Sequence, residues 1–188
     1  MKIATILGSP RKRGNTAVVL QAFEALVAPQ HEIDRINITD YHVAGCLGCD
    51  HCFNVLAEPG CAQRDDAVQL LERILAADLV VYAAPVYCWA FPAQLKALLD
   101  RHYCLVKWQE GEVAAALMAG KRAVLLVTCG GDAEDNADLI QTMFEREIAY
   151  VRGVVAGKYV VANCTTPAEL AGRAAEMGRR MARELIGG

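Results

Sequence analysis

The sequence predicts an α/β fold in which a five-stranded parallel sheet lies between two layers of helices. Strand-like and helix-like periodicities alternate along the chain, as they do in proteins built from βαβ units. Several of the strand-like runs are uniformly apolar, which is typical of strands that are covered on both faces. The 188 residues are 54% hydrophobic and only 22% charged, so the chain can bury a full core.

Each element is expected at a defined range. The strands are expected at 2–8, 31–38, 78–85, 122–128 and 157–163, and the helices at 15–26, 65–77, 92–103, 135–150 and 167–186. Right-handed crossovers between such elements favour a doubly wound, three-layer arrangement with the flavodoxin-like strand order 2-1-3-4-5. We expect residues 1–188 to form a single domain, with an insertion at about 39–64.

Charge and composition indicate which kinds of binding partner and which cellular compartment to expect. A net charge of -3 argues against a general nucleic-acid-binding protein. No apolar run reaches the ~18 residues that a membrane span requires, so we expect a cytoplasmic protein without membrane contact. An apolar connector over 104–120 carries Val106, Trp108, Leu117 and Met118, and it predicts a homodimer or homotetramer interface.

The loop after the first strand has the residues of a phosphate site. Ligands of doubly wound sheets bind beyond the carboxyl ends of the strands, and a helix amino end offers unpaired N–H groups to an anion. Arginine can neutralise the phosphate, glycine lets the backbone close around it, and short polar side chains add hydrogen bonds. The loop differs from the P-loop and from the dinucleotide fingerprint. The expected phosphate ligands are Ser9, Arg11, Gly14, Asn15 and Thr16.

The loop after the third strand carries Tyr87, Trp89 and Phe91 beyond the end of the sheet. Flat aromatic side chains and backbone amides there suit the apolar ring and polar edge of an isoalloxazine. Taken alone, such an aromatic cluster is more often part of a core or an interface.

These two loops resemble the NADPH-dependent FMN reductase family, in the branch that includes iron–sulfur flavoproteins. The stretch 8–16 resembles the family's phosphate loop, and the stretch 85–101 resembles its Pro-x-Tyr segment followed by Pro-Ala-Gln-Leu-Lys and an Asp-Arg pair. The resemblance implies that the flavin is lined by Pro85, Val86, Tyr87, Cys88 and Trp89, and by Thr128, Gly130 and Gly131 after the fourth strand.

The insertion at 39–64 contains four cysteines in a short segment. Cys46, Cys49 and Cys52 have the C-x2-C-x2-C spacing that holds part of an iron–sulfur cluster in bacterial ferredoxins, and Cys61 follows after eight residues. By resemblance to the iron–sulfur flavoproteins, these four would hold a [4Fe–4S] cluster. Two alternatives stay open: a zinc site in which His51 could replace one thiolate, and unligated thiols such as a Cys46/Cys49 redox pair.

The function that the resemblance implies is FMN-dependent NAD(P)H oxidoreductase activity, with a small-molecule or protein electron acceptor. FMN would exchange hydride and electrons, NAD(P)H would be the co-substrate, and a cluster would relay single electrons. No side chain is expected to act as a catalytic acid or base. The alternatives are a non-enzymatic electron carrier of flavodoxin type and a zinc-stabilised binding module without flavin.

Overall fold

The central element of the fold is a parallel five-stranded sheet with the order β2-β1-β3-β6-β7. The structure is a computed structural model that describes residues 1–170 and 172–187. The strands are β1 (Lys2–Leu7), β2 (Glu32–Asn37), β3 (Leu79–Pro85), β6 (Arg122–Thr128) and β7 (Val154–Val161). Because β4 and β5 form a separate two-stranded sheet, this order confirms the predicted 2-1-3-4-5 arrangement.

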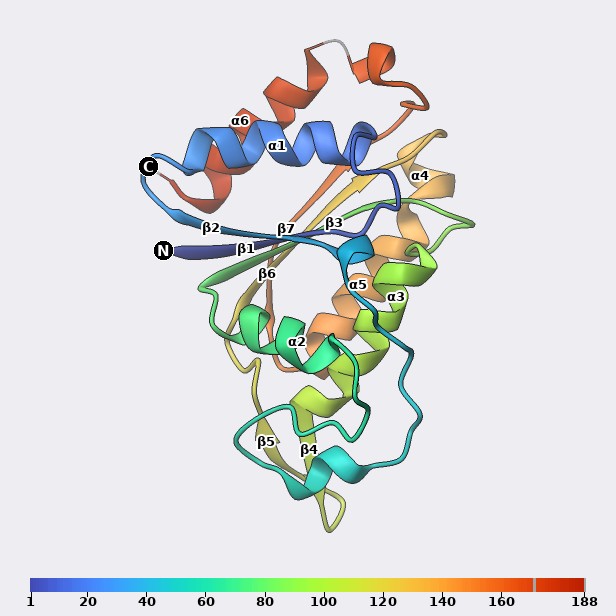
Figure 1. Ribbon diagram of the computed structural model, residues 1–188. Helices are drawn as coiled ribbons and strands as arrows, with labels where there is room; N and C mark the ends of the chain where they lie inside the picture. Colours follow the sequence, from blue (N-terminus) through green and yellow to red (C-terminus); the bar gives the residue numbers. More distant parts are fainter. Residues whose placement is uncertain (171, 188) are drawn as a thin grey trace.

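Helices cover both faces of the sheet, as a parallel sheet requires (Figure 1). One face is covered by α1 (Asn15–Val27) and α6 (Arg173–Leu185), and the other by α2 (Ala67–Leu75), α3 (Ala93–Asp100) and α5 (Asp138–Tyr150). A short helix, α4 (Ala133–Asn136), precedes α5. Two buried hydrophobic clusters, one on each side of the sheet, form the core. In the described ranges no helix has the length and apolarity to cross a membrane.

The apolar strands explain why the sheet is central. All seven residues of β3 are buried, and so are all residues of β6 except Arg122. Side chains of a strand alternate between the two faces, so each of these strands contributes to both clusters. The third predicted strand therefore lies inside the sheet, between β1 and β6.

The connector over 104–120 differs most from the expectation. It forms the antiparallel hairpin of β4 (Val106–Gln109) and β5 (Glu112–Ala116), which follows the 3-10 helix η3 (Arg101–Leu105). Val106 and Met118 are fully buried in the chain's own core, so they are not available to an oligomer interface. Trp108 is the large apolar side chain of this segment that stays exposed, at 36%.

One smaller expectation also fails. The helix expected over 167–186 is divided into the 3-10 helix η4 (Pro167–Leu170) and α6, and residue 171 of that range lies outside the described residues.

The long insertion is tied to the core by a buried ion pair. After η1 (Ile38–Asp40), the chain leaves the sheet and reaches η2 (His51–Asn54) beside the β4–β5 hairpin (Figure 1). Arg101 lies at the end of α3, and its guanidinium donates to the carboxylate of Asp65 at 2.6 Å and to the carbonyl of Ala44 at 3.0 Å. The Arg101 and Asp65 side chains are only 1% and 5% exposed. This pair therefore holds both ends of the cysteine segment.

Replacing Asp65 with asparagine tests this anchor. Burial raises the pKa of Asp65, but hydrogen bonds from Arg101 and from the amides of Ala44 and Ala67 lower it, and the net pKa lies below the ordinary value. The ion pair therefore stabilises the fold above the unfolded-state pKa of about 3.9, and this stability is lost as the pH falls through the folded-state pKa. At pH 7, Asp65→Asn should lower the free energy of unfolding by about 3–5 kcal/mol, because it leaves Arg101 buried and unpaired.

Urea unfolding at several pH values measures both effects. Asp40→Asn is the matched control, because it removes an exposed ion pair with Lys12. Exposed pairs contribute little to stability, so this variant should resemble the parent protein. Equal losses in the two variants would contradict the anchoring role of Asp65.

Candidate functional site

A cavity of about 330 Å³ lies beyond the carboxyl ends of β1, β3 and β6. Ten of the thirteen residues predicted to bind a cofactor line it: Ser9, Arg11, Gly14, Asn15, Thr16, Pro85, Val86, Tyr87, Thr128 and Gly130. Cys129, Cys164 and Thr165 complete the lining. The structure thus brings four separate loops together, those after β1, β3, β6 and β7, at the sheet edge where doubly wound folds bind ligands.

The amino end of α1 faces this cavity with its N–H groups uncapped. Gly14 occupies the N-cap position, so it has no side chain to accept from the first turn, and that turn contains no acidic residue. A methyl group added to Gly14 would lie 3.2 Å from Cβ and 3.3 Å from the carbonyl oxygen of Arg11. Glycine therefore leaves room for the tight turn that brings Arg11 over the helix end. Uncapped N–H groups and the helix dipole favour an anion here.

Buried hydroxyl groups join α1 to the sheet at this point. Oγ1 of Thr16 and Oγ1 of Thr128 lie 2.6 Å apart, and both residues are buried. The Asn15 amide donates to the Cys164 carbonyl at 2.8 Å, and the Ser9 hydroxyl accepts from the Arg11 amide at 3.1 Å. These bonds fix the position of the helix end relative to the carboxyl ends of the strands.

The cavity walls are neutral apart from Arg11. Burial raises the pKa of Cys129 and of Cys164, so both stay protonated thiols at neutral pH. Neither histidine nor a carboxylate lines the cavity among the described residues. A negatively charged ligand would therefore meet one cation and several hydrogen-bond donors, without an opposing charge.

The three basic residues of the first loop, Arg11, Lys12 and Arg13, differ in their partners. Lys12 forms an ion pair with Asp40, whereas in 1–170 and 172–187 the guanidinium groups of Arg11 and Arg13 have no carboxylate partner. A second cavity, of about 440 Å³, adjoins the first and is lined by Arg11, Lys12, Arg13, Gly14, Asn15 and Thr165. Arg11 is the basic residue of this loop that lines both cavities.

Three of the predicted residues, Cys88, Trp89 and Gly131, do not line the cavity. Tyr87 and Ala90 exchange two backbone hydrogen bonds of 3.0 Å, which makes Cys88 and Trp89 the two central residues of a tight turn. Their φ angles are 48° and 61°, in the left-handed region that a type I′ turn requires. Trp89 is 54% exposed, and its indole donates to the Asp135 carbonyl at 3.0 Å. The turn directs Trp89 toward α4.

Sequence reasoning missed Cys129, Cys164 and Thr165. Cys129 lies between two predicted residues and is a small buried residue. Cys164 and Thr165 follow β7, and ligand chemistry was expected only after the first, third and fourth strands. The hydrogen bond from the Cys164 amide to the Cys129 carbonyl, at 3.0 Å, brings this last loop beside the cavity. No local motif signals such a pairing.

The four cysteines of the insertion do not form a metal site in this arrangement. Within the described ranges, no group of three or more His, Cys, Asp or Glu side chains is placed to hold a metal ion. Cys46 and Cys49 are exposed, Cys52 is buried, and Cys61 accepts a hydrogen bond from Arg101 at 3.0 Å. The structure therefore does not support the predicted [4Fe–4S] ligand set.

A buried lysine holds part of this segment in place. The Lys107 side chain is fully buried, and its ammonium donates to the carbonyls of Cys52 and Pro59, each at 2.9 Å. Lys107 belongs to β4, so the hairpin that the sequence did not predict is the support for the cysteine segment. Here the segment is organised around two buried cations, Arg101 and Lys107.

Together, the fold and the cavity define a flavodoxin-like α/β protein with a candidate anion site at the amino end of α1. The comparison with known sequences is more specific. The chain belongs to the NADPH-dependent FMN reductase family, whose sequence model matches residues 1–176. This confirms the resemblance that the loops at 8–16 and 85–101 indicate.

Individual relatives agree with this assignment. An iron–sulfur flavoprotein of Methanosarcina thermophila is 38% identical over 124 residues, which is 64% of this chain and 63% of that protein. An FMN-dependent NADH:quinone oxidoreductase of Stenotrophomonas maltophilia is 30% identical over 146 residues, covering 75% of this chain and 74% of the relative. The alignments with iron–sulfur flavoproteins span less than two thirds of those proteins, 63% in one case and 45% in another.

A solved structure supports the fold over the whole chain. The NAD(P)H:quinone oxidoreductase from Methanothermobacter marburgensis superposes with a TM-score of 0.73, and the comparison covers 100% of this chain and 98% of that one. The two sequences are only 19% identical, so this likeness bears on the fold alone.

Replacing Arg11 with alanine tests the anion site. If Arg11 binds the phosphate of FMN, its loss removes a charged hydrogen bond of ~1.5–3 kcal/mol. The Kd for FMN should rise roughly ten- to a hundredfold in a fluorescence titration, while the unfolding temperature of the flavin-free protein stays unchanged. Arg64→Ala, which removes an exposed arginine of the insertion, is the control. An unchanged Kd in Arg11→Ala would exclude Arg11 from the site.

Proposed function

We propose that this chain is an FMN-dependent NAD(P)H oxidoreductase, and that residues 1–188 act as one FMN-binding unit in a cytoplasmic homodimer or homotetramer. The observation that carries the proposal is the 330 Å³ cavity, where the uncapped end of α1, Arg11 and the Tyr87 loop meet. Family membership supports the choice of FMN and NAD(P)H. The predicted acceptor remains a small molecule or a protein.

The residues of the cavity fit FMN in two parts. Arg11, the α1 amides and the Ser9, Asn15 and Thr16 side chains would bind the phosphate. The segment from Pro85 to Tyr87 and the loop at Thr128 and Gly130 would lie against the ring, where Gly130 allows close approach of the backbone. Tyr87 is 38% exposed, so it would form the rim where a nicotinamide or an acceptor enters.

When bound, FMN supplies the redox chemistry, because its ring accepts hydride and releases electrons singly or in pairs. The protein's part is to bind, to orient and to exclude water. Neutral thiols at Cys129 and Cys164 keep that wall free of competing charge. We assign no side chain as a catalytic acid or base.

An iron–sulfur relay is not part of the proposal. Several relatives are named iron–sulfur flavoproteins, which suggests an iron–sulfur cluster for this chain as well. Within the described residues, Cys46, Cys49, Cys52 and Cys61 are not grouped as metal ligands, and we route no electron through a cluster. The eight cysteines are free thiols, which is consistent with a reducing compartment.

Steady-state oxidation of NADH and NADPH by the FMN-loaded protein, with a quinone as acceptor, tests the proposal. The account predicts turnover of at least one nicotinamide cofactor that continues after treatment with an iron chelator. Turnover should fall with FMN occupancy in Arg11→Ala at limiting FMN and recover when FMN is in excess.

Two results would contradict the proposal. Reduction of FMN by dithionite but by neither nicotinamide would indicate an electron carrier of flavodoxin type. Protein that contains stoichiometric zinc and fails to bind FMN would instead indicate a zinc-stabilised binding module.

A further inference from the structure

The outer edge of the sheet at β7 has a feature that the proposed function does not use. β7 is the last strand of the sheet, and nothing in the described part of the chain pairs with its outer edge. A cavity of about 360 Å³ lies between this strand and α6, and it shares no lining residue with the candidate flavin cavity. Unpaired strand edges accept extended peptides as additional strands.

The end of β7 that adjoins the cavity is regular and has free backbone groups. The register of β6 and β7 shifts near Ala123, but from Val124 and Gly157 onward the pairing is continuous. The Val161 carbonyl accepts from the Cys129 amide, so the polar backbone groups of Val161 point inward. In a strand, the backbone N–H and C=O groups of successive residues point alternately to the two sides. The N–H and C=O groups of Lys158 and Val160 therefore point away from β6, toward the unpaired edge. Val160 lines the cavity.

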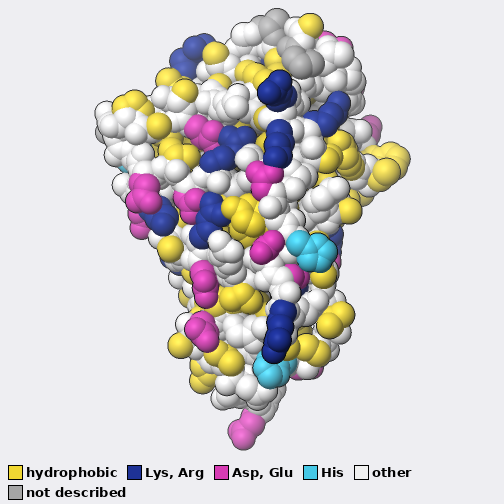
Figure 2. Space-filling view, viewed as in Figure 1, with side chains coloured by type: hydrophobic (Ala, Val, Ile, Leu, Met, Phe, Trp, Pro, Cys, Tyr) yellow, Lys and Arg dark blue, Asp and Glu magenta, His cyan; other side chains and the backbone are white. Residues whose placement is uncertain are grey.

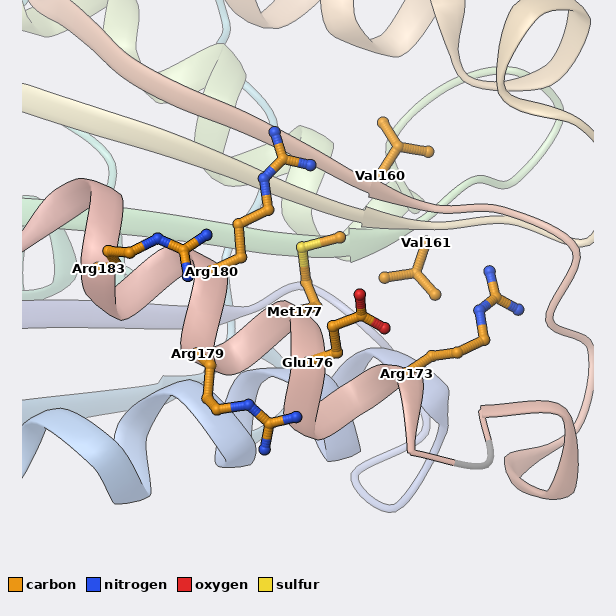
Figure 3. A pocket seen from close by; sticks show the side chains of 8 residues that line it. All are labelled: Val160, Val161, Arg173, Glu176, Met177, Arg179, Arg180 and Arg183. Atoms are coloured by element: carbon orange, nitrogen blue, oxygen red, sulfur yellow. The ribbon is translucent and has the colours of Figure 1, made fainter.

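The other wall of the cavity is strongly basic. Its lining contains four arginines of α6, namely Arg173, Arg179, Arg180 and Arg183, and a single carboxylate, Glu176. Figure 3 shows Arg180 extending across the strands, Met177 and Glu176 between it and Arg173, and Arg179 directed away from the strand. Lys and Arg side chains are also frequent over the α1–α6 layer in Figure 2, although the chain has a net charge of -3.

The basic side chains near the strand are held in place. Arg173 donates to the carbonyls of Ala162 and Asn163, at 2.5 and 3.3 Å. The Arg180 guanidinium lies 5.5 Å from the centre of the Tyr159 ring and donates to Glu184 at 3.0 Å. In 1–170 and 172–187, Arg183 has no carboxylate partner within ion-pair distance. Arg173 and Arg180 therefore lie beside the strand from its end at Val161 back to Tyr159.

We propose that the β7 edge binds an extended acidic segment of a partner protein as a sixth strand. The acidic side chains would occupy every second position, on the face toward α6, because Tyr159 and Val161 point to that face and successive side chains alternate. On the opposite face, Lys158 pairs with Glu145 of α5, so the intervening positions of the ligand would be apolar or neutral.

A second copy of this chain is the less suitable occupant. Pairing of two β7 edges would place Arg180 and Arg183 of one protomer near the same residues of the other, and like charges at an interface are repulsive. An acidic ligand meets these arginines with opposite charge and supplies the backbone groups that the edge lacks.

The test uses the FMN-saturated protein and a fluorescein-labelled peptide of three Glu-Val repeats, with a peptide of three Lys-Val repeats for comparison. Fluorescence anisotropy should show roughly tenfold or greater preference for the acidic peptide, decreasing with salt. Arg180→Gln/Arg183→Gln should weaken its binding by roughly tenfold or more. The control Arg64→Gln/Lys96→Gln removes the same charge elsewhere and should change the Kd by less than about twofold.

Amide hydrogen exchange locates the peptide. Binding should slow exchange at Lys158 and Val160, whose N–H groups point outward. Three results would overturn the proposal: equal affinity for the two peptides, an unchanged Kd in the Arg180→Gln/Arg183→Gln variant, or slowed exchange that is confined to other segments. Thermal unfolding of the variant, compared with the control variant, shows that lost binding is not lost folding.

Discussion

The hydrogen bond between Thr16 and Thr128 joins the two parts on which the candidate site depends. Thr16 lies in the first turn of α1 and Thr128 ends β6, so this 2.6 Å contact fixes the helix end against the carboxyl edge of the sheet. Gly14 leaves that helix end uncapped and Arg11 lies beside it. The position of the candidate anion site therefore follows from the doubly wound topology, and the loops supply the residues that line it.

The cysteine segment obeys a different constraint. Its ends are held by Arg101 and its middle by Lys107, both buried cations that donate to carbonyls of the segment. Buried cations are costly unless they are paired or well hydrogen-bonded, so these contacts specify one path for the chain. That path leaves Cys46 and Cys49 exposed. The spacing of the cysteines in the sequence is compatible with a cluster, but among the described residues no group of three or more His, Cys, Asp or Glu side chains is placed to hold a metal ion.

These two regions show what the sequence could predict and what it could not. The sheet order and most cavity residues were predictable, because apolar strands and a Gly-containing loop before a helix have local signatures. The β4–β5 hairpin was not, since its short strands lack the alternation of a half-exposed strand: Val106 and Lys107 are both fully buried. The family resemblance predicted Trp89 beside the flavin. In the structure, a turn with two positive φ angles directs its side chain toward α4. Such turns usually contain asparagine or glycine, so Cys88 and Trp89 carried no signal for one.

The central claim is that the amino end of α1 binds a phosphate group, and comparing FMN with riboflavin tests it most directly. The two ligands share the isoalloxazine ring and differ in the phosphate. Titration of the flavin-free protein, followed by flavin fluorescence, should give a Kd for FMN that is lower by about a hundredfold or more. Two or more charged hydrogen bonds of ~1.5–3 kcal/mol each account for such a difference. Riboflavin binding within about threefold of FMN would contradict the account.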